Sequence, residues 1–220
     1  MLKLNFKTAI LLFILFLYTC LSPFLLNWNS SFYFNYLNPI FWFVFLIIGI
    51  LFFRNDYCRK KYKYDFIQIV IISVIIYLIL FYTAGLITGY TRLPYARTVT
   101  GVLKNILQYV FPIVSMEYLR QCFINRSGKN KILLIIITGI FAAINITLQT
   151  YNFSIVVVDD VFDLLFSIVI PEIAKSMLLS YLTYRSDFVA SLIYAIVPAM
   201  LMYIIPILPD LNWFLDGSLQ

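Results

Sequence analysis

The chain has 220 residues, of which 63% are hydrophobic and only 12% are charged, and its formal net charge is +6. A soluble globular domain is about a quarter charged, so this chain has too little polar surface to cover a body in water. The composition excludes an ordinary soluble enzyme and predicts an integral protein of the lipid bilayer. The chain has no histidine, which removes the commonest metal ligand and general base, and we expect no metal site and no cofactor.

Apolar runs follow one another along the whole chain, and about 20 apolar residues cross the hydrocarbon core as a helix. We expect helices at 8–26, 37–53, 66–89, 103–123, 132–149, 161–184 and 188–208. Open strands are excluded because their backbone groups would lack partners in lipid. The expected fold is all-α, a single multi-pass domain over residues 1–220 with about seven transmembrane helices.

The basic residues between these runs predict the orientation. One side of the membrane would hold eleven of them: Lys3, Lys7, Arg54, Arg59, Lys60, Lys61, Lys63, Arg126, Lys129, Lys131 and Arg185. The other side would hold three: Arg92, Arg97 and Lys104. The more basic side is cytoplasmic, so we expect the N-terminus inside and the C-terminus outside, in the cell membrane. The positive charge then serves orientation, and no nucleic-acid partner is expected.

Two of the seven runs carry ionisable residues in their interiors: Glu117 and Arg120 in the fourth, Glu172 and Lys175 in the sixth. A charge near the bilayer centre costs roughly 2.5–3.5 kcal/mol on insertion scales. These four residues are therefore the candidate site, with Glu172 and Lys175 expected to be the deeper pair and Arg120 about one turn from the cytoplasmic surface.

Four roles are open for these charges. Each acid has a base three residues on, on the same helix face, so each pair can neutralise itself within its helix. The same residues could instead pair between the two helices, Glu117 with Lys175 and Glu172 with Arg120. They could also form a substrate or catalytic site, or reach the membrane surface. A Ser–Lys dyad at Lys175 would need Ser115 or Ser167 to approach it, because neighbouring Ser176 points to another face.

Two further features concern the backbone and the polar side chains. Pro112 and Pro171 lie in the same two runs and should interrupt regular helix geometry one turn earlier. Asn38, Gln108, Asn145 and Gln149 should form hydrogen bonds between helices or at the interface. The segment 90–104 is either an ordinary outer loop or a partly re-entrant one whose arginines meet lipid phosphates or Asp159 and Asp160.

Residues 80–215 resemble the long N-terminal membrane region of signal peptidase I-like proteins of clostridia and related bacteria. The resemblance lies in the spacing of Asn105, Pro112, Glu117 and Arg120, in Pro171-Glu172, and in Pro206-x-x-Pro209-Asp210. The family's Ser-x-Met-x-Pro box and its later lysine are absent, since Ser115-Met116 is followed by Glu117-Tyr118. The resemblance implies a membrane scaffold without activity of its own. The chain would be a stand-alone copy of that region or a fragment of a longer serine peptidase, with a peptidase catalytic domain or another membrane protein as partner.

Two other classes remain open. The first is a CAAX-protease-like (CPBP) intramembrane protein, a family with a Glu-Glu-x-x-x-Arg motif and two membrane histidines. Here Met116-Glu117 replaces the glutamate pair, the arginine comes one residue early, and histidine is missing. The second is a small transporter or substrate-binding subunit, because proline-interrupted spans with charge near the midplane are typical of transporters.

Overall fold

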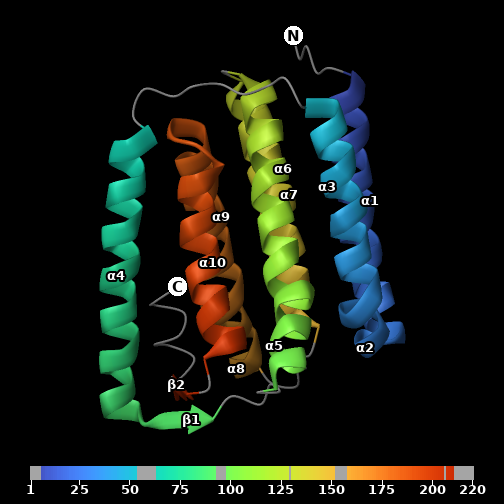
Figure 1. Ribbon diagram of the computed structural model, residues 1–220. Helices are drawn as coiled ribbons and strands as arrows, with labels where there is room; N and C mark the ends of the chain where they lie inside the picture. The colour runs from blue at the N-terminus through green and yellow to red at the C-terminus, as the bar shows by residue number, and fades with distance from the viewer. Residues whose placement is uncertain are drawn as a thin grey trace.

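A computed structural model describes residues 6–53, 63–92, 98–128, 130–151, 158–205 and 207–210. In these residues the chain forms seven continuous helical segments that lie side by side as a bundle (Figure 1). Four are α1 (Phe6–Trp28), α4 (Lys63–Thr88), α7 (Lys131–Thr150) and α10 (Phe188–Ile204). The other three are composite: α2 (Ser30–Phe32), η1 (Tyr33–Leu37) and α3 (Asn38–Phe53); α5 (Val99–Asn105), η2 (Ile106–Val110) and α6 (Phe111–Ser127); and α8 (Val158–Leu164), η3 (Leu165–Val169) and α9 (Ile170–Arg185). The all-α bundle expected from the sequence is confirmed.

Five of these segments are long and apolar enough to cross a membrane: Phe6–Trp28, Ser30–Phe53, Lys63–Thr88, Val99–Ser127 and Lys131–Thr150. Phe188–Leu201 is apolar but shorter. Val158–Arg185 is not among the five, and it carries six charged residues: Asp159, Asp160, Asp163, Glu172, Lys175 and Arg185. The helices thus have the length and composition of a multi-pass membrane protein, although the described residues give five clear spans where seven were expected.

Side-chain caps mark where several helices begin. Asn29 accepts a hydrogen bond from the Phe32 amide, Thr98 from the Gly101 amide, and Asn130 from the Ile132 and Leu133 amides. Asp187 accepts from the amide of Phe188 at the start of α10. Such caps satisfy amides that have no partner inside the helix. Asn29 explains why the second helical segment begins at Ser30, seven residues earlier than expected.

Each composite segment contains a π-helical turn directly before an Xaa-Pro pair. η1, η2 and η3 end just before Asn38-Pro39, Phe111-Pro112 and Ile170-Pro171. Proline offers no amide hydrogen, and its ring crowds the carbonyl four residues back. A turn widened by one residue accommodates both effects. The interruption expected at Pro112 and Pro171 is confirmed as a π-helical turn, and Pro39 shows the same device.

Two short strands close one end of the bundle. β1 (Tyr90–Arg92) pairs antiparallel with β2 (Ile207–Pro209), with Thr91 opposite Leu208. Figure 1 shows them at the same end as α2, α5 and α8, and we call this the strand end. All three β1 residues are exposed, so this part of segment 90–104 does not re-enter the bundle. Residues 93–97 lie outside the described residues, and from Val99 the chain is already helical.

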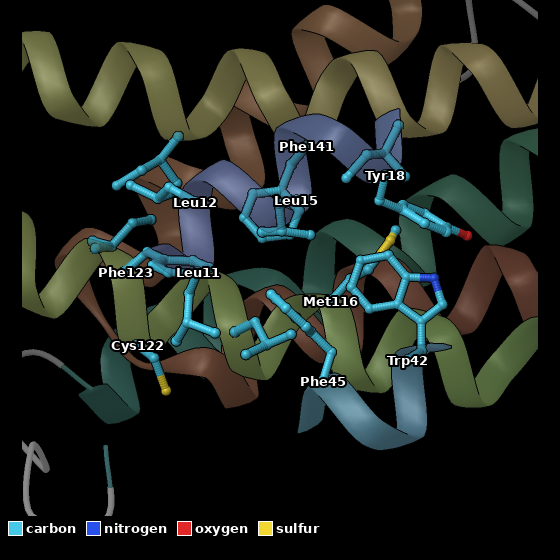
Figure 2. Close-up of a cluster of buried hydrophobic side chains, with 14 of the residues drawn as sticks. Leu11, Leu12, Leu15, Tyr18, Trp42, Phe45, Met116, Cys122, Phe123 and Phe141 are labelled. Carbon is cyan, nitrogen blue, oxygen red and sulfur yellow. The ribbon is translucent and has the colours of Figure 1, made fainter. Parts of the chain in front are cut away.

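Apolar side chains gather in two clusters. The larger joins α1, α3, α6 and α7, and Figure 2 shows its members Leu15, Trp42, Phe45, Phe123 and Phe141 converging from these four helices. The smaller joins α4, α9 and α10 through Val70, Val74, Leu182 and Ala190. Buried polar side chains lie where α6 and α7 of the first cluster meet α9. This polar seam contains the candidate site.

Candidate functional site

Glu117 and Arg120 form an ion pair within α6. Arg120 Nη2 lies 3.2 Å from Glu117 Oε1, and the side chains are 0% and 3% exposed respectively. The three-residue spacing places both groups on one face of the helix. The expectation that the pair could neutralise itself within its own helix is confirmed, and complete burial excludes the idea that Arg120 reaches the membrane surface.

Arg120 also connects α6 to α9 and α7. Its Nη1 donates hydrogen bonds to the Ser176 carbonyl at 3.0 Å and to Ser180 Oγ at 3.4 Å. Ser180 Oγ also accepts a hydrogen bond from Thr138 on α7 at 2.9 Å. The guanidinium lies 4.8 Å from the centre of the Phe141 ring, a favourable cation–π distance. One arginine therefore holds three helices together, which confirms that the fourth and sixth helical segments pack against each other.

Glu172, at the start of α9, is held by three donors. Its Oε1 accepts from Gln149 Nε2 at 2.6 Å and from Lys175 Nζ at 3.1 Å, and its Oε2 accepts from Asn145 Nδ2 at 3.2 Å. Two of these donors come from α7, so the carboxylate fixes α9 against α7. The residue is 1% exposed. Glu117 and Glu172 thus both face the bundle interior, as expected.

The position of the two pairs along the bundle depends on the helix along which it is measured. Arg120 lies seven residues before the end of α6, and its acceptor Ser180 lies five residues before the end of α9. Glu172 lies near the middle of the segment Val158–Arg185, although its donor Gln149 is next to the last residue of α7. The expectation that Glu172 and Lys175 are the deeper pair in the membrane stays a prediction.

The interhelical ion pairs considered from the sequence are not formed among the described residues. Both acids pair with the base of their own helix, and the links between helices are hydrogen bonds to serine, threonine and amide groups. The described side chains also form no Ser–Lys dyad, since Ser115 and Ser167 donate to carbonyls of their own helices and Lys175 donates to Glu172.

Some polar atoms of the seam have no hydrogen-bond partner. They are Glu117 Oε2, Arg120 Nε, Arg120 Nη2 and Ser176 Oγ, all fully buried. The Arg120–Glu117 contact thus supplies charge compensation without a well-aligned hydrogen bond. The stability of a buried charge depends strongly on its partner, because a buried charge that loses its partner is not compensated by solvent.

Two polar groups of the structure were not identified from the sequence. Asp187 forms an ion pair with Lys63 at 2.8 Å and accepts a hydrogen bond from Gln121. These two contacts join α4, α6 and α10 at the end opposite the strand end. Tyr18 donates to Asn38 Oδ1 at 2.7 Å and also hydrogen-bonds Tyr33. The position of Asp187 could have been predicted, because an aspartate directly before an apolar run indicates a helix cap. Its contact with Lys63, 124 positions away in the sequence, could not.

The four amides expected to form hydrogen bonds all do so. Asn38, Asn145 and Gln149 have the partners described above, and Gln108 in η2 donates to Asn35 in η1. This last bond joins two of the π-helical turns.

Comparison with known protein families, curated proteins and solved structures yields no match. The resemblance to the membrane region of signal peptidase I-like proteins therefore remains a prediction from the residues that carry it. The site has to be interpreted from its own geometry.

Proposed function

We propose that this chain is a scaffold of the bacterial cell membrane, similar to the non-catalytic membrane region of signal peptidase I-like proteins, with the N-terminus inside. The observation that carries this proposal is the bonding of its deep charges. Each one is paired within its helix, and each pair is bonded across to a neighbouring helix by groups of the chain itself. Such charges stabilise one arrangement of helices.

The bonding of Glu172 argues against a role as general base. A carboxylate that removes a proton must be within hydrogen-bond reach of its substrate. Both Glu172 oxygens accept hydrogen bonds from groups of the chain itself, and the residue is 1% exposed, so a substrate does not reach it in this arrangement. Glu117 does have a free oxygen, but the side chain is 3% exposed, so a substrate does not reach it in this arrangement.

The charge distribution supports the proposed orientation. Lys63 begins α4 and Lys131 begins α7, whereas Arg126 and Arg185 lie in the last turns of α6 and α9. All four are at the end opposite the strand end, which carries Arg92 and Lys104. An end rich in lysine and arginine is the cytoplasmic one in membrane proteins.

The proposed partner is a peptidase catalytic domain or another membrane protein. The test is processing of a signal-peptide reporter in cells with and without the gene for this chain. Deletion should slow processing, and both the wild-type chain and Glu172→Gln should restore it, because a scaffold needs the shape of this residue more than its charge. Processing that is unaffected by deletion would contradict the partnership. Restoration by the wild type alone, with Glu172→Gln folded normally, would contradict the scaffold role.

The two alternatives differ in what supports them. The CAAX-protease-like alternative requires histidines, which this chain does not have. The substrate-binding alternative is favoured by one observation, the partial exposure of the Lys175 side chain, which is 22% accessible. A ligand-dependent rise in the thermal stability of the purified chain would support it.

A further inference from the structure

The two halves of the bundle differ in charge at the end opposite the strand end. On the side of α4, α9 and α10, basic and acidic groups occur together. Lys63 forms an ion pair with Asp187 at 2.8 Å, Asp65 lies in the first turn of α4, and Arg185 lies in the last turn of α9. On this side, two basic residues are accompanied by two acidic ones.

The side formed by α1, α3, α6 and α7 carries basic residues at this end and no acidic one among its described residues. The basic residues are Lys7 in the first turn of α1, Arg126 in the last turn of α6 and Lys131 at the start of α7. The one acid in these four helices is Glu117, which is paired with Arg120. It lies nine residues before Arg126, about 14 Å along the helix. The described part of this corner therefore has a surplus of positive charge.

Two of these cations converge on the last residues of α3 (Figure 1). Lys7 Nζ lies 5.3 Å from the centre of the Phe52 ring, and the Arg126 guanidinium carbon lies 4.6 Å from the centre of the Phe53 ring. Arg126 Nη2 also donates to the Phe52 carbonyl at 3.5 Å. Cation–π contacts of this kind hold both side chains at the helix end. The exposed Lys7 ammonium has three N–H donors, and the described residues offer them no acceptor.

An exposed apolar surface continues along α1 from Lys7. Ile10, Leu17 and Leu21 follow it at spacings of three, seven and four residues, so these side chains lie on one side of the helix. All three are exposed, and Phe52 beside Lys7 is exposed as well. A cation at the helix end followed by an apolar surface matches the order of groups in a phospholipid, in which a charged phosphate precedes the acyl chains.

We propose that Lys7 and Arg126, held at the end of α3, bind the phosphate of an anionic phospholipid whose acyl chain lies along α1. Basic groups between the ends of membrane helices bind anionic lipid headgroups. The surplus of positive charge, to which Lys131 adds, favours a lipid with net negative charge over a zwitterionic one. The apolar surface of α1 favours a lipid over free phosphate. This site goes beyond the proposed scaffold role and does not depend on it.

The test is native mass spectrometry of the purified full-length chain in detergent micelles, titrated with phosphatidylglycerol or with phosphatidylcholine of the same acyl chains. The first phosphatidylglycerol should bind roughly tenfold more tightly than the first phosphatidylcholine, because a basic residue near a charged headgroup contributes about fivefold in affinity. Lys7→Gln should weaken the binding of phosphatidylglycerol about fivefold and leave that of phosphatidylcholine unchanged.

A matched variant and a competitor separate this site from general attraction of anions. Arg185→Gln removes an exposed arginine at the same end, on the side that carries acids, and should leave the binding of phosphatidylglycerol unchanged. Arg126→Gln should weaken it, and Lys7→Gln, at an exposed position, keeps the test decisive if Arg126→Gln does not fold. Inorganic phosphate in excess should not displace the lipid. Equal affinity for the two lipids, equal weakening by Lys7→Gln and Arg185→Gln, or displacement by inorganic phosphate would overturn the proposal.

Discussion

The ion pair of Glu117 and Arg120 should show strong thermodynamic coupling. Both side chains are almost completely buried, at 3% and 0% exposure. Removing one partner of a buried pair leaves an uncompensated charge, which costs about 3–5 kcal/mol. We therefore expect Glu117→Gln and Arg120→Met each to lower the free energy of unfolding by about that amount.

The double variant should be more stable than either single variant. It contains no buried charge in this place, and it loses mainly the Arg120 hydrogen bonds to Ser176 and Ser180. Ser180 keeps its hydrogen bond from Thr138, so these losses cost about 1–3 kcal/mol in total. The pair of Glu172 and Lys175 provides a comparison. Lys175 is 22% exposed and Glu172 keeps two amide donors, so that coupling should be only about 1 kcal/mol.

Both cycles can be measured by reversible unfolding in mixed micelles titrated with a denaturing detergent and followed by tryptophan fluorescence. The reasoning is refuted if the Glu117/Arg120 double variant is as destabilised as the sum of its single variants. It is also refuted if the Glu172/Lys175 pair proves the more strongly coupled. Rescue of Glu172→Ala by Arg120→Ala would show that Glu172 pairs with Arg120 between the helices, a pair that the described side chains do not form.

Three further predictions concern packing, capping and orientation. A Cβ atom at Gly49 would lie 2.6 Å from Leu119 Cδ2, where α3 meets α6, so Gly49→Ala should lower the free energy of unfolding by about 1–3 kcal/mol. A Cβ atom at Gly139 would meet no atom within 4 Å, so Gly139→Ala should be neutral or stabilising. Thermal unfolding measures both effects. Asp187→Ala removes the cap of α10 and the contact with Lys63. In the same assay it should lower the free energy of unfolding by about 1–3 kcal/mol. The control Asp65→Ala, at the same end, should change it by less than about 0.5 kcal/mol. An impermeant thiol reagent outside the cell should label a cysteine placed at Ser30 or Gly217 and spare one at Lys61 or Asn130, and the opposite labelling would reverse the proposed orientation.

The helices could be predicted from the sequence because hydrophobic runs and capping residues act locally. The fourth segment was expected at 103–123 and is helical from Val99 to Ser127, with Thr98 as its cap. The π-helical turns leave no trace in the hydrophobic pattern, and Pro112 and Pro171 alone indicated that the regular helix is interrupted before them. The four deep charges were found because charge inside an apolar run is costly whatever the fold.

The partners of these charges depend on how the helices are placed relative to one another. Asn145 and Gln149 were expected to form hydrogen bonds, but nothing in the sequence joins them to Glu172. The cluster of Asp187, Lys63 and Gln121 connects segments distant along the chain and became visible only in the folded bundle.

The most direct test of the scaffold role is the activity of the purified full-length chain in lipid vesicles. The substrates are a signal-peptide substrate and a prenylated peptide, and the wild type is compared with Glu172→Gln. Because the deep charges are bonded to groups of the chain itself, we expect neither protein to cleave either substrate. We also expect the two proteins to have similar thermal stability. Cleavage by the wild type that is lost in Glu172→Gln at unchanged stability would show that this site is catalytic and would contradict the account.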